Sequence, residues 1–125
     1  MHYALIVYET EADMALRGNP ETAPAYMGAY QAYHEALLKA GVAAGGEALH
    51  TPALATTVRL REGRRLVQDG PFSETKEQLG GLFVIDVPDL DTALEWAARC
   101  PAASTGSVEV RPVMPSPSRD IPVPP

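Results

Sequence analysis

The stretch Val67–Gly81 reads Val-Gln-Asp-Gly-Pro-Phe-Ser-Glu-Thr-Lys-Glu-Gln-Leu-Gly-Gly and lies between two strand-like runs. It combines an aspartate, three glycines, a proline and several other charged residues. An ordinary hairpin connection needs only about two to five residues. We therefore interpret this stretch as a segment that the surrounding elements hold in position next to a pocket.

Strands are expected on both sides of this stretch. Before it, Ala55–Leu60 and Arg65–Gln68 flank Arg61-Glu62-Gly63-Arg64, a pattern that predicts a β-hairpin with glycine in its loop. After it, Leu82–Val87 predicts a strand that is apolar on both faces. The charged residues in between are expected on a solvated turn: Glu74, Lys76 and Glu77.

The N-terminal part predicts a strand, a connector and a helix. Tyr3–Tyr8 is a strand-like run with apolar residues on both faces, and Glu9–Glu21 is a polar connector. The helix begins near Thr22, a candidate N-cap, and ends before Gly41, a typical residue after a helix. Three acids of the connector are expected in solvent: Glu9, Glu11 and Asp13.

The remaining segments repeat this order. Val42–Leu49 predicts a second strand, loosened by two glycines. Leu90–Cys100 predicts a helix with Asp89 as N-cap and Pro101 as its stop. Val108–Met114 predicts a last strand, at a sheet edge because Pro112 cannot donate to a ladder.

Two β-α-β halves with a hairpin inserted between them predict an α+β fold, a ferredoxin-like βαββαβ sandwich. The strands at Tyr3–Tyr8 and Leu82–Val87 should then lie in the middle of the sheet, as their apolar composition suggests. We expect one domain over residues 1–114 and a proline-rich, unpacked tail over 115–125.

The same fold leaves one face of the sheet without helices. The second set of apolar side chains on the two central strands would be exposed there, which monomers rarely tolerate. A second copy of the chain can cover that face through a twofold axis. The sequence therefore predicts a homodimer with sheets face to face, of the dimeric α/β-barrel type.

Composition narrows the function classes. The net charge is −6 and the estimated pI is 4.9, which argues against direct nucleic-acid binding. The single cysteine, Cys100, cannot form an internal disulfide and fits a reducing compartment. No apolar run reaches the roughly 18 residues of a membrane span. We expect a cytoplasmic protein.

Several segments together resemble a known family. Val67–Gly81, with Asp91-Thr-Ala-Leu-Glu-Trp-Ala-Ala-Arg-Cys-Pro and Val108-Glu-Val-Arg-Pro-Val, closely resembles the YCII-related proteins, specifically their DGPF branch. The resemblance covers roughly residues 1–114 and implies a ferredoxin-like fold and a dimer of the α/β-barrel type. DGPF-branch proteins also resemble those often encoded beside alternative sigma factors.

The resemblance implies a candidate site as well. In the broader superfamily, a histidine of the first helix and an aspartate before the third core strand have been proposed as a catalytic pair, and at least one member is a dehydrochlorinase. The aspartate position falls at Asp69, counted back from Gly80-Gly81. The histidine position falls at Tyr30, where this chain departs from the pattern.

The local chemistry of these residues leaves alternatives open. Asp69 before Gly-Pro fits a turn residue that caps local amides, and equally an acid or base in an apolar cleft. Tyr30 fits core packing or proton donation, and His34 lies one turn further along the same helix face. Residues expected to line the cleft are Gly70, Pro71, Phe72, His50 and Gly80.

Two functions remain as hypotheses. In the first, a homodimer binds a small organic molecule and catalyses cofactor-free lyase or isomerase chemistry with Asp69, Tyr30 and His34. In the second, the chain is a non-enzymatic interaction module linked to a sigma-factor system. Histidines without a shared motif predict no metal site, and Cys100 is expected to pack rather than react.

Overall fold

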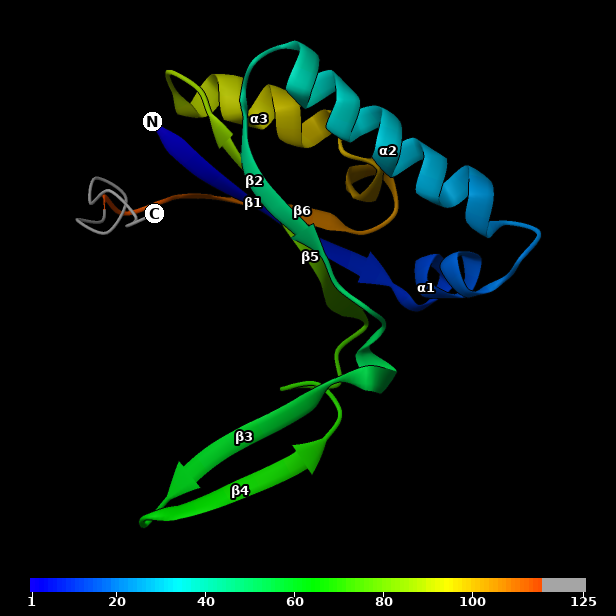
Figure 1. Cartoon of the computed structure of the whole chain (residues 1–125), viewed down its shortest axis with the longest axis vertical. Coiled ribbons are helices and arrows are strands. Elements are labelled where there is room, and N and C mark those ends of the chain that lie inside the picture. Colours follow the sequence, from blue (N-terminus) through cyan, green and yellow to red (C-terminus); the bar gives the residue numbers. More distant parts are fainter. Residues whose placement is uncertain (116–125) are drawn as a thin grey trace, which may run out of the picture.

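The computed structural model describes residues 1–115, and it forms one antiparallel four-stranded sheet with helices on one face (Figure 1). The strand order is β2-β5-β1-β6, built from β2 (Ala43–Ala48), β5 (Glu77–Asp86), β1 (His2–Thr10) and β6 (Ser107–Pro112). The two strands predicted to be central are indeed central, so the predicted α+β architecture is confirmed, and the strand order is compatible with a ferredoxin-like arrangement. The predicted tail lies outside the described residues, apart from Pro115.

Alternating side chains of β1 build the core. Tyr3, Leu5 and Val7 are buried on the face that the helices cover, and the next residue in this series, Glu9, is buried as well. Leu5 faces Phe83 of β5 and Val110 of β6 through the ladder. A side-chain period of two therefore places an acid at the end of an apolar row.

Helix α2 (Ala23–Lys39) covers this row with Tyr33 and Leu37. The Tyr33 hydroxyl donates to the carbonyl of Trp96 at 2.7 Å, which joins α2 to α3. Gly41 follows the helix with φ +73°, as predicted for a residue after a helix C-terminus. Thr22 precedes the helix but makes no side-chain cap; its hydroxyl donates to the Leu16 carbonyl at 2.6 Å.

The predicted polar connector is wrong in part, because it contains a helix, α1 (Glu11–Gly18). Thr10 and Asp13 form a capping box: the Thr10 amide donates to Asp13 at 3.0 Å and the Asp13 amide to the Thr10 hydroxyl at 3.1 Å. The Thr105 hydroxyl also donates to Asp13 at 2.9 Å. Glu9 and Asp13 are therefore buried rather than solvated, while Glu11 is exposed.

The C-terminal half follows the sequence closely. Helix α3 (Leu90–Arg99) begins at Asp89, whose side chain accepts from the Thr92 amide at 2.8 Å, and a short 3-10 turn, η2 (Pro101–Ser104), follows. Cys100 is buried between them, as expected for packing. Strand β6 pairs only with β1, so Pro112 lies on an edge strand as predicted.

The inserted hairpin projects away from the sheet (Figure 1). It consists of β3 (Thr56–Arg61) and β4 (Arg64–Asp69), preceded by the 3-10 turn η1 (Pro52–Leu54). Glu62 and Gly63 form its two-residue loop with φ values of +52° and +75°, the positive values that tight hairpin turns require. Strand β5 already begins at Glu77, so Val67–Gly81 is the end of one strand, a loop and the start of another.

The face of the sheet opposite the helices carries a row of apolar side chains that are only partly buried: Ala4, Ile6, Tyr8, Leu82 and Val84. The ladder pairs Ala4 with Val84 and Ile6 with Leu82, which makes this open face continuous across the central strands. Among residues 1–115, no helix is both long and apolar enough to cross a membrane.

Candidate functional site

A cavity of about 360 Å³ lies between helix α2 and the edge of the sheet. Strands β1, β2 and β5 supply its floor, α2 supplies one wall, and Arg17 of α1 closes one end. The lining is mostly apolar, with side chains such as Val7, Met27 and Phe83 around a few polar groups. This composition is typical of small-molecule sites.

Glu9 is the most buried polar group of the cavity, with 3% of its surface exposed. It sits opposite a bulge in β5, where the pairing with β1 shifts by one residue between Val7 and Tyr8. A Cβ atom on Gly80 would lie 1.8 Å from Glu9 Oε1, so only glycine leaves room for this carboxyl group. The Glu9 Oε2 atom is buried and has no hydrogen-bond partner in the described part of the chain, residues 1–115.

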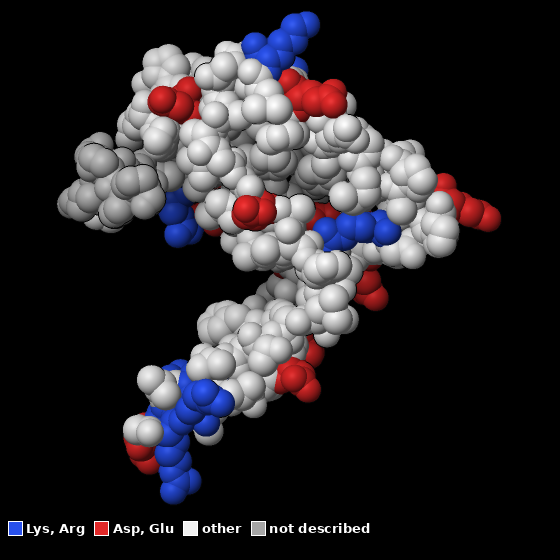
Figure 2. Space-filling view, in the orientation of Figure 1, with Lys and Arg blue, Asp and Glu red and all other residues white. Residues whose placement is uncertain are grey.

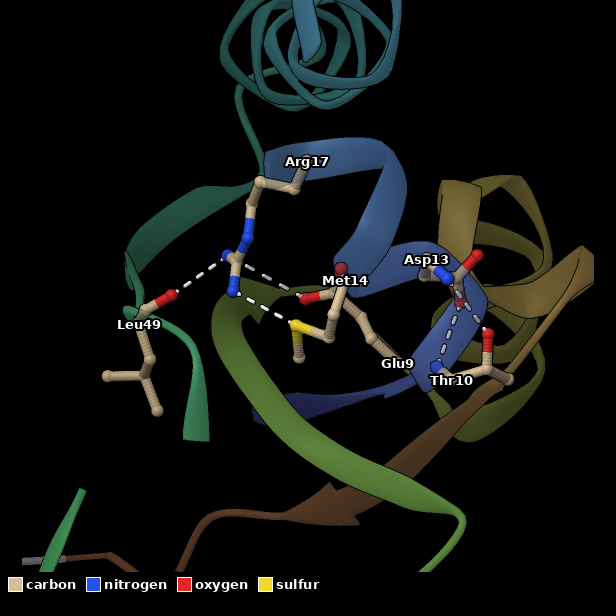
Figure 3. Close-up of polar contacts among 6 residues, drawn as sticks. All are labelled: Glu9, Thr10, Asp13, Met14, Arg17 and Leu49. Atoms are coloured by element: carbon tan, nitrogen blue, oxygen red, sulfur yellow. Dashed lines mark hydrogen bonds and ion pairs between the residues drawn. The ribbon is translucent and has the colours of Figure 1, made fainter. Parts of the chain in front are cut away.

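Arg17 approaches Glu9 but is held by other groups (Figure 3). Its Nη1 donates to the Leu49 carbonyl at 2.9 Å, and its Nη2 lies 3.1 Å from the Met14 sulfur. The closest distance between Arg17 Nη1 and Glu9 Oε1 is 4.0 Å, which is too long for a hydrogen bond. The guanidinium therefore balances the charge of Glu9 without satisfying its oxygens.

Two phenol groups of α2 line the same cavity. Tyr26 and Tyr30 are one helical turn apart, and their rings meet edge to face with centroids 5.5 Å apart. Both hydroxyls are buried without a hydrogen-bond partner among residues 1–115. Buried polar groups are nearly always paired, so three unpaired groups around one cavity make it the candidate binding site.

Burial sets the electrostatics of these groups. It raises the pKa of the Glu9 carboxyl, an effect that Arg17 opposes and Asp13 reinforces. It also raises the pKa of the Tyr30 phenol, and the nearby Glu9 carboxylate adds to this shift. Tyr30 therefore stays protonated and can donate a hydrogen bond, while Glu9 takes up a proton more readily than an exposed glutamate.

The structure distributes the predicted site residues over separate places. Tyr30, His34 and Gly80 line the cavity under α2, although His34 is largely exposed. Asp69, at the end of β4, is exposed and lines neither this cavity nor the second one described below. Within one chain, the carboxyl groups that share a cavity with Tyr30 are those of Glu9 and Glu47, and Glu9 is the buried one of the two.

The other predicted residues lie at the base of the hairpin. His50, Pro71 and Phe72 line a second cavity of about 580 Å³, which also reaches Tyr8 and Leu79 on the open face of the sheet. Phe72 is 78% exposed. Gly70 lines neither cavity; its amide donates to the Ala55 carbonyl at 2.7 Å and its carbonyl accepts from Thr57 at 2.9 Å.

Sequence reasoning missed Glu9, Arg17 and Tyr26 as site residues. The signal for Glu9 was present, because it continues the alternation of Tyr3, Leu5 and Val7 on the buried face. Tyr26 lies one helical turn before Tyr30, and this spacing was the signal that could have found it. Nothing in the sequence pointed to Arg17, since its place depends on the unpredicted helix α1.

Comparison with known proteins identifies the family. A model of the YCII-related domain matches residues 1–117. The chain belongs to the YCII-related family. A protein of Rhizobium meliloti (strain 1021), described only as uncharacterised, is 37% identical over 115 residues, which cover 90% of this chain and 92% of the relative. Residues 1–115 hold no cluster of three or more His, Cys, Asp or Glu side chains that could bind a metal ion.

Proposed function

We propose that this YCII-related protein, a member of the DGPF branch, binds a small organic molecule in the cavity under α2. The observation that supports this most directly is the set of unpaired groups there: the Glu9 Oε2 atom and the hydroxyls of Tyr26 and Tyr30. A ligand with a matching polar group would satisfy all three. The apolar walls would bury the rest of such a molecule.

The proposed chemistry is cofactor-free proton transfer of the lyase or isomerase type. Glu9 is the acid or base, because its burial moves the carboxyl pKa upward from the usual range. Tyr30 donates a hydrogen bond to the reacting group, and His34 contacts the ligand at the mouth of the cavity. This proposal gives Glu9 the role that the sequence assigned to Asp69.

The test is a thermal-shift screen of small organic molecules with three variants. Glu9→Gln should abolish the ligand-induced rise in melting temperature, because it replaces the buried carboxyl group, the proposed acid or base, with a neutral amide. Glu35→Gln is the matched control, an exposed glutamate on α2 that should leave the response intact. Loss of response in Asp69→Asn, with Glu9→Gln responding normally, would return the role to Asp69 and contradict the assignment.

We propose further that the protein is a homodimer that buries the open face of the sheet. The partly buried row Ala4, Ile6, Tyr8, Leu82 and Val84 supports this. The hairpin leaves the sheet on the same side (Figure 1), and the second cavity joins Tyr8 of that face to Phe72 of the hairpin loop. A second copy against this surface would cover both.

The dimer is tested by light scattering coupled to size-exclusion chromatography. Ile6→Glu places a charge in the middle of the open face and should give a folded monomer. Leu38→Glu is the control, because Leu38 is 57% exposed on α2, away from the open face, and should leave the dimer intact. A wild-type chain that elutes as a monomer at all concentrations would contradict the proposal.

A second candidate function is a non-enzymatic module that acts with a sigma-factor regulator, and the hairpin favours it. Residues 56–69 carry four arginines against two acids in a chain of net charge −6. Figure 2 shows the basic side chains gathered at the hairpin tip. Leu60 is 67% exposed beside them. Such a surface suits an acidic partner protein.

This alternative predicts a different set of sensitive residues. Reversing the charge at Arg59 and Arg61 should abolish binding to a purified sigma-factor regulator encoded beside this protein. Calorimetry measures the binding, and Glu9→Gln should not affect it. If neither variant changes that binding, the hairpin is not the docking surface.

A further inference from the structure

We propose that the ligand of the cavity under α2 is an organic cation, with an amine or amidine head on an apolar body. This inference rests on the proposed binding function and adds the chemical class. It follows from which polar atoms of the cavity lack partners, which are already engaged, and what surrounds them.

The Glu9 carboxyl group offers an unpaired acceptor for a cation. Glu9 is 97% buried, yet its Oε2 atom has no donor among the residues that the structure describes. Leaving a carboxylate oxygen unpaired and out of water is costly, and the cost is recovered when a charged N–H donor binds it. An ammonium or amidinium group supplies two or more such donors, whereas an alcohol supplies one and a carboxylate none.

Aromatic side chains of the cavity also favour a cation. Tyr26 and Tyr30 meet edge to face, and Phe83 lines the same cavity. Aromatic faces attract cations through the ring quadrupole, most strongly where water is excluded. The two phenol oxygens are unpaired as well and can accept from the same ammonium group. A buried acid beside tyrosines thus forms a cage for a positive charge.

The engaged groups argue against an anionic ligand. Arg17 is the only cationic side chain among the lining residues apart from a protonatable His34, and its two Nη atoms already contact Leu49 and Met14. The lining holds two carboxyl groups, Glu9 and Glu47, against this one guanidinium. With both acids ionised, these three side chains carry a net charge of −1, which has the same sign as the −6 of the whole chain. An anion would meet the Glu9 carboxyl group, and the unengaged buried donors that remain for it are the uncharged hydroxyls of Tyr26 and Tyr30.

The experiment compares three probes of nearly equal shape: benzylamine, benzyl alcohol and benzoate. Each is titrated into the full-length protein at pH 7 and constant ionic strength, and binding is read from NMR shifts of residues that line the cavity. Benzylamine should bind at least tenfold more tightly than benzyl alcohol, and benzoate should not saturate. In Glu9→Gln the preference for the amine over the alcohol should fall below twofold, while Glu35→Gln keeps it.

Each other outcome overturns the inference. Equal binding of the amine and the alcohol would show a cavity that binds neutral molecules, and the proposed function would stand without the cation. Tightest binding of benzoate would point to Arg17 as the anchor. If no probe shifts the cavity residues while circular dichroism shows a folded protein, the proposed binding function fails together with the cation.

Discussion

The cavity under α2 and the hairpin place an acidic residue in opposite environments. In the cavity, Glu9 is 3% exposed, its carboxyl pKa is raised by burial, and Gly80 makes room for it. On the hairpin, Asp69 is exposed, at the end of a strand that packs only against one neighbour. The sequence around Asp69 is rich in turn residues and ionisable groups, whereas the sequence around Glu9 is an ordinary strand end.

The difference shows that a segment rich in glycine, proline and charged residues does not have to contain the acid whose pKa is perturbed. Gly70 and Pro71 beside Asp69 shape a loop, and water surrounds the carboxylate there. Glu9 has a plain neighbourhood in sequence, but three strands and a helix remove it from water. Desolvation is what perturbs an acid, so the fold rather than the motif decides which carboxyl group has a raised pKa.

The largest effect on stability is expected at the junction of β1 and α1, which directly follows Glu9. Asp13→Ala removes the capping box with Thr10 and the acceptor of the Thr105 hydroxyl. Losing a cap costs about 1 kcal/mol, and losing the part-buried hydrogen bond from the Thr105 hydroxyl to a carboxylate adds about 1–2 kcal/mol. We expect the free energy of unfolding to fall by about 2–3 kcal/mol, measured by urea denaturation.

The hairpin supplies the matched control for that experiment. Asp69→Ala removes a carboxylate of the same size from an exposed position, where substitutions usually change stability by no more than about 0.5 kcal/mol. A loss at Asp69 equal to that at Asp13 would contradict the contrast between a buried and a solvated acid.

The next largest effect on stability is expected at Gly80 of β5, which lines the cavity. In Gly80→Ala the new methyl group would overlap the Glu9 carboxyl, with 1.8 Å to Oε1 and 2.7 Å to Cδ. Overpacking of this kind typically costs about 1–3 kcal/mol, and the displaced carboxyl should also lose its ligand response. Urea denaturation and the thermal-shift screen measure the two consequences.

Two further variants separate steric overlap from backbone effects. Gly28→Ala lies in α2 with open space around the new Cβ, so it should raise stability by up to about 1 kcal/mol through helix propensity. Adding Glu9→Ala to Gly80→Ala should restore part of the lost stability, because it removes the atoms that collide. No recovery in the double variant would mean that the cost arises in the backbone.

The fold was largely predictable from local patterns, whereas the site was not. Apolar runs such as Tyr3–Tyr8 and Leu82–Val87 fix the central strands, and Asp89 and Gly41 mark helix ends by chemistry that acts within one turn. Helix α1 was missed although Thr10 and Asp13 have the Thr-x-x-Asp spacing of a capping box, because the helix that they begin is only eight residues long and lies in a polar segment.

The cavity depends on contacts between segments far apart in the chain. Tyr30 was predicted as a site residue because a family position falls there, and it does line the cavity. Its neighbour Glu9 comes from another strand, and Gly80 meets Glu9 across a bulge that no sequence pattern announced. Residues that act together through such long-range packing are visible only when the register between strands is known.

The smallest effect, and the most direct comparison, is the pH dependence of stability in Glu9→Gln. Burial raises the pKa of folded Glu9 above the ordinary value of 4.5, so ionising it costs more in the folded than in the unfolded chain. Its contribution to stability is therefore complete below about pH 4.5 and is lost as the pH rises through the folded pKa. Arg17 limits this loss, and Asp13 increases it.

Glutamine carries no charge, so Glu9→Gln escapes that loss. Its free energy of unfolding, measured by urea denaturation between pH 4 and pH 8, should rise relative to wild type as the pH increases, although the variant no longer responds to ligand. Asp69→Asn, an exposed change, should stay within about 0.5 kcal/mol of wild type. A Glu9→Gln curve parallel to wild type would mean that Arg17 compensates the buried charge fully, and the cavity would then lack the perturbed acid on which its proposed chemistry depends.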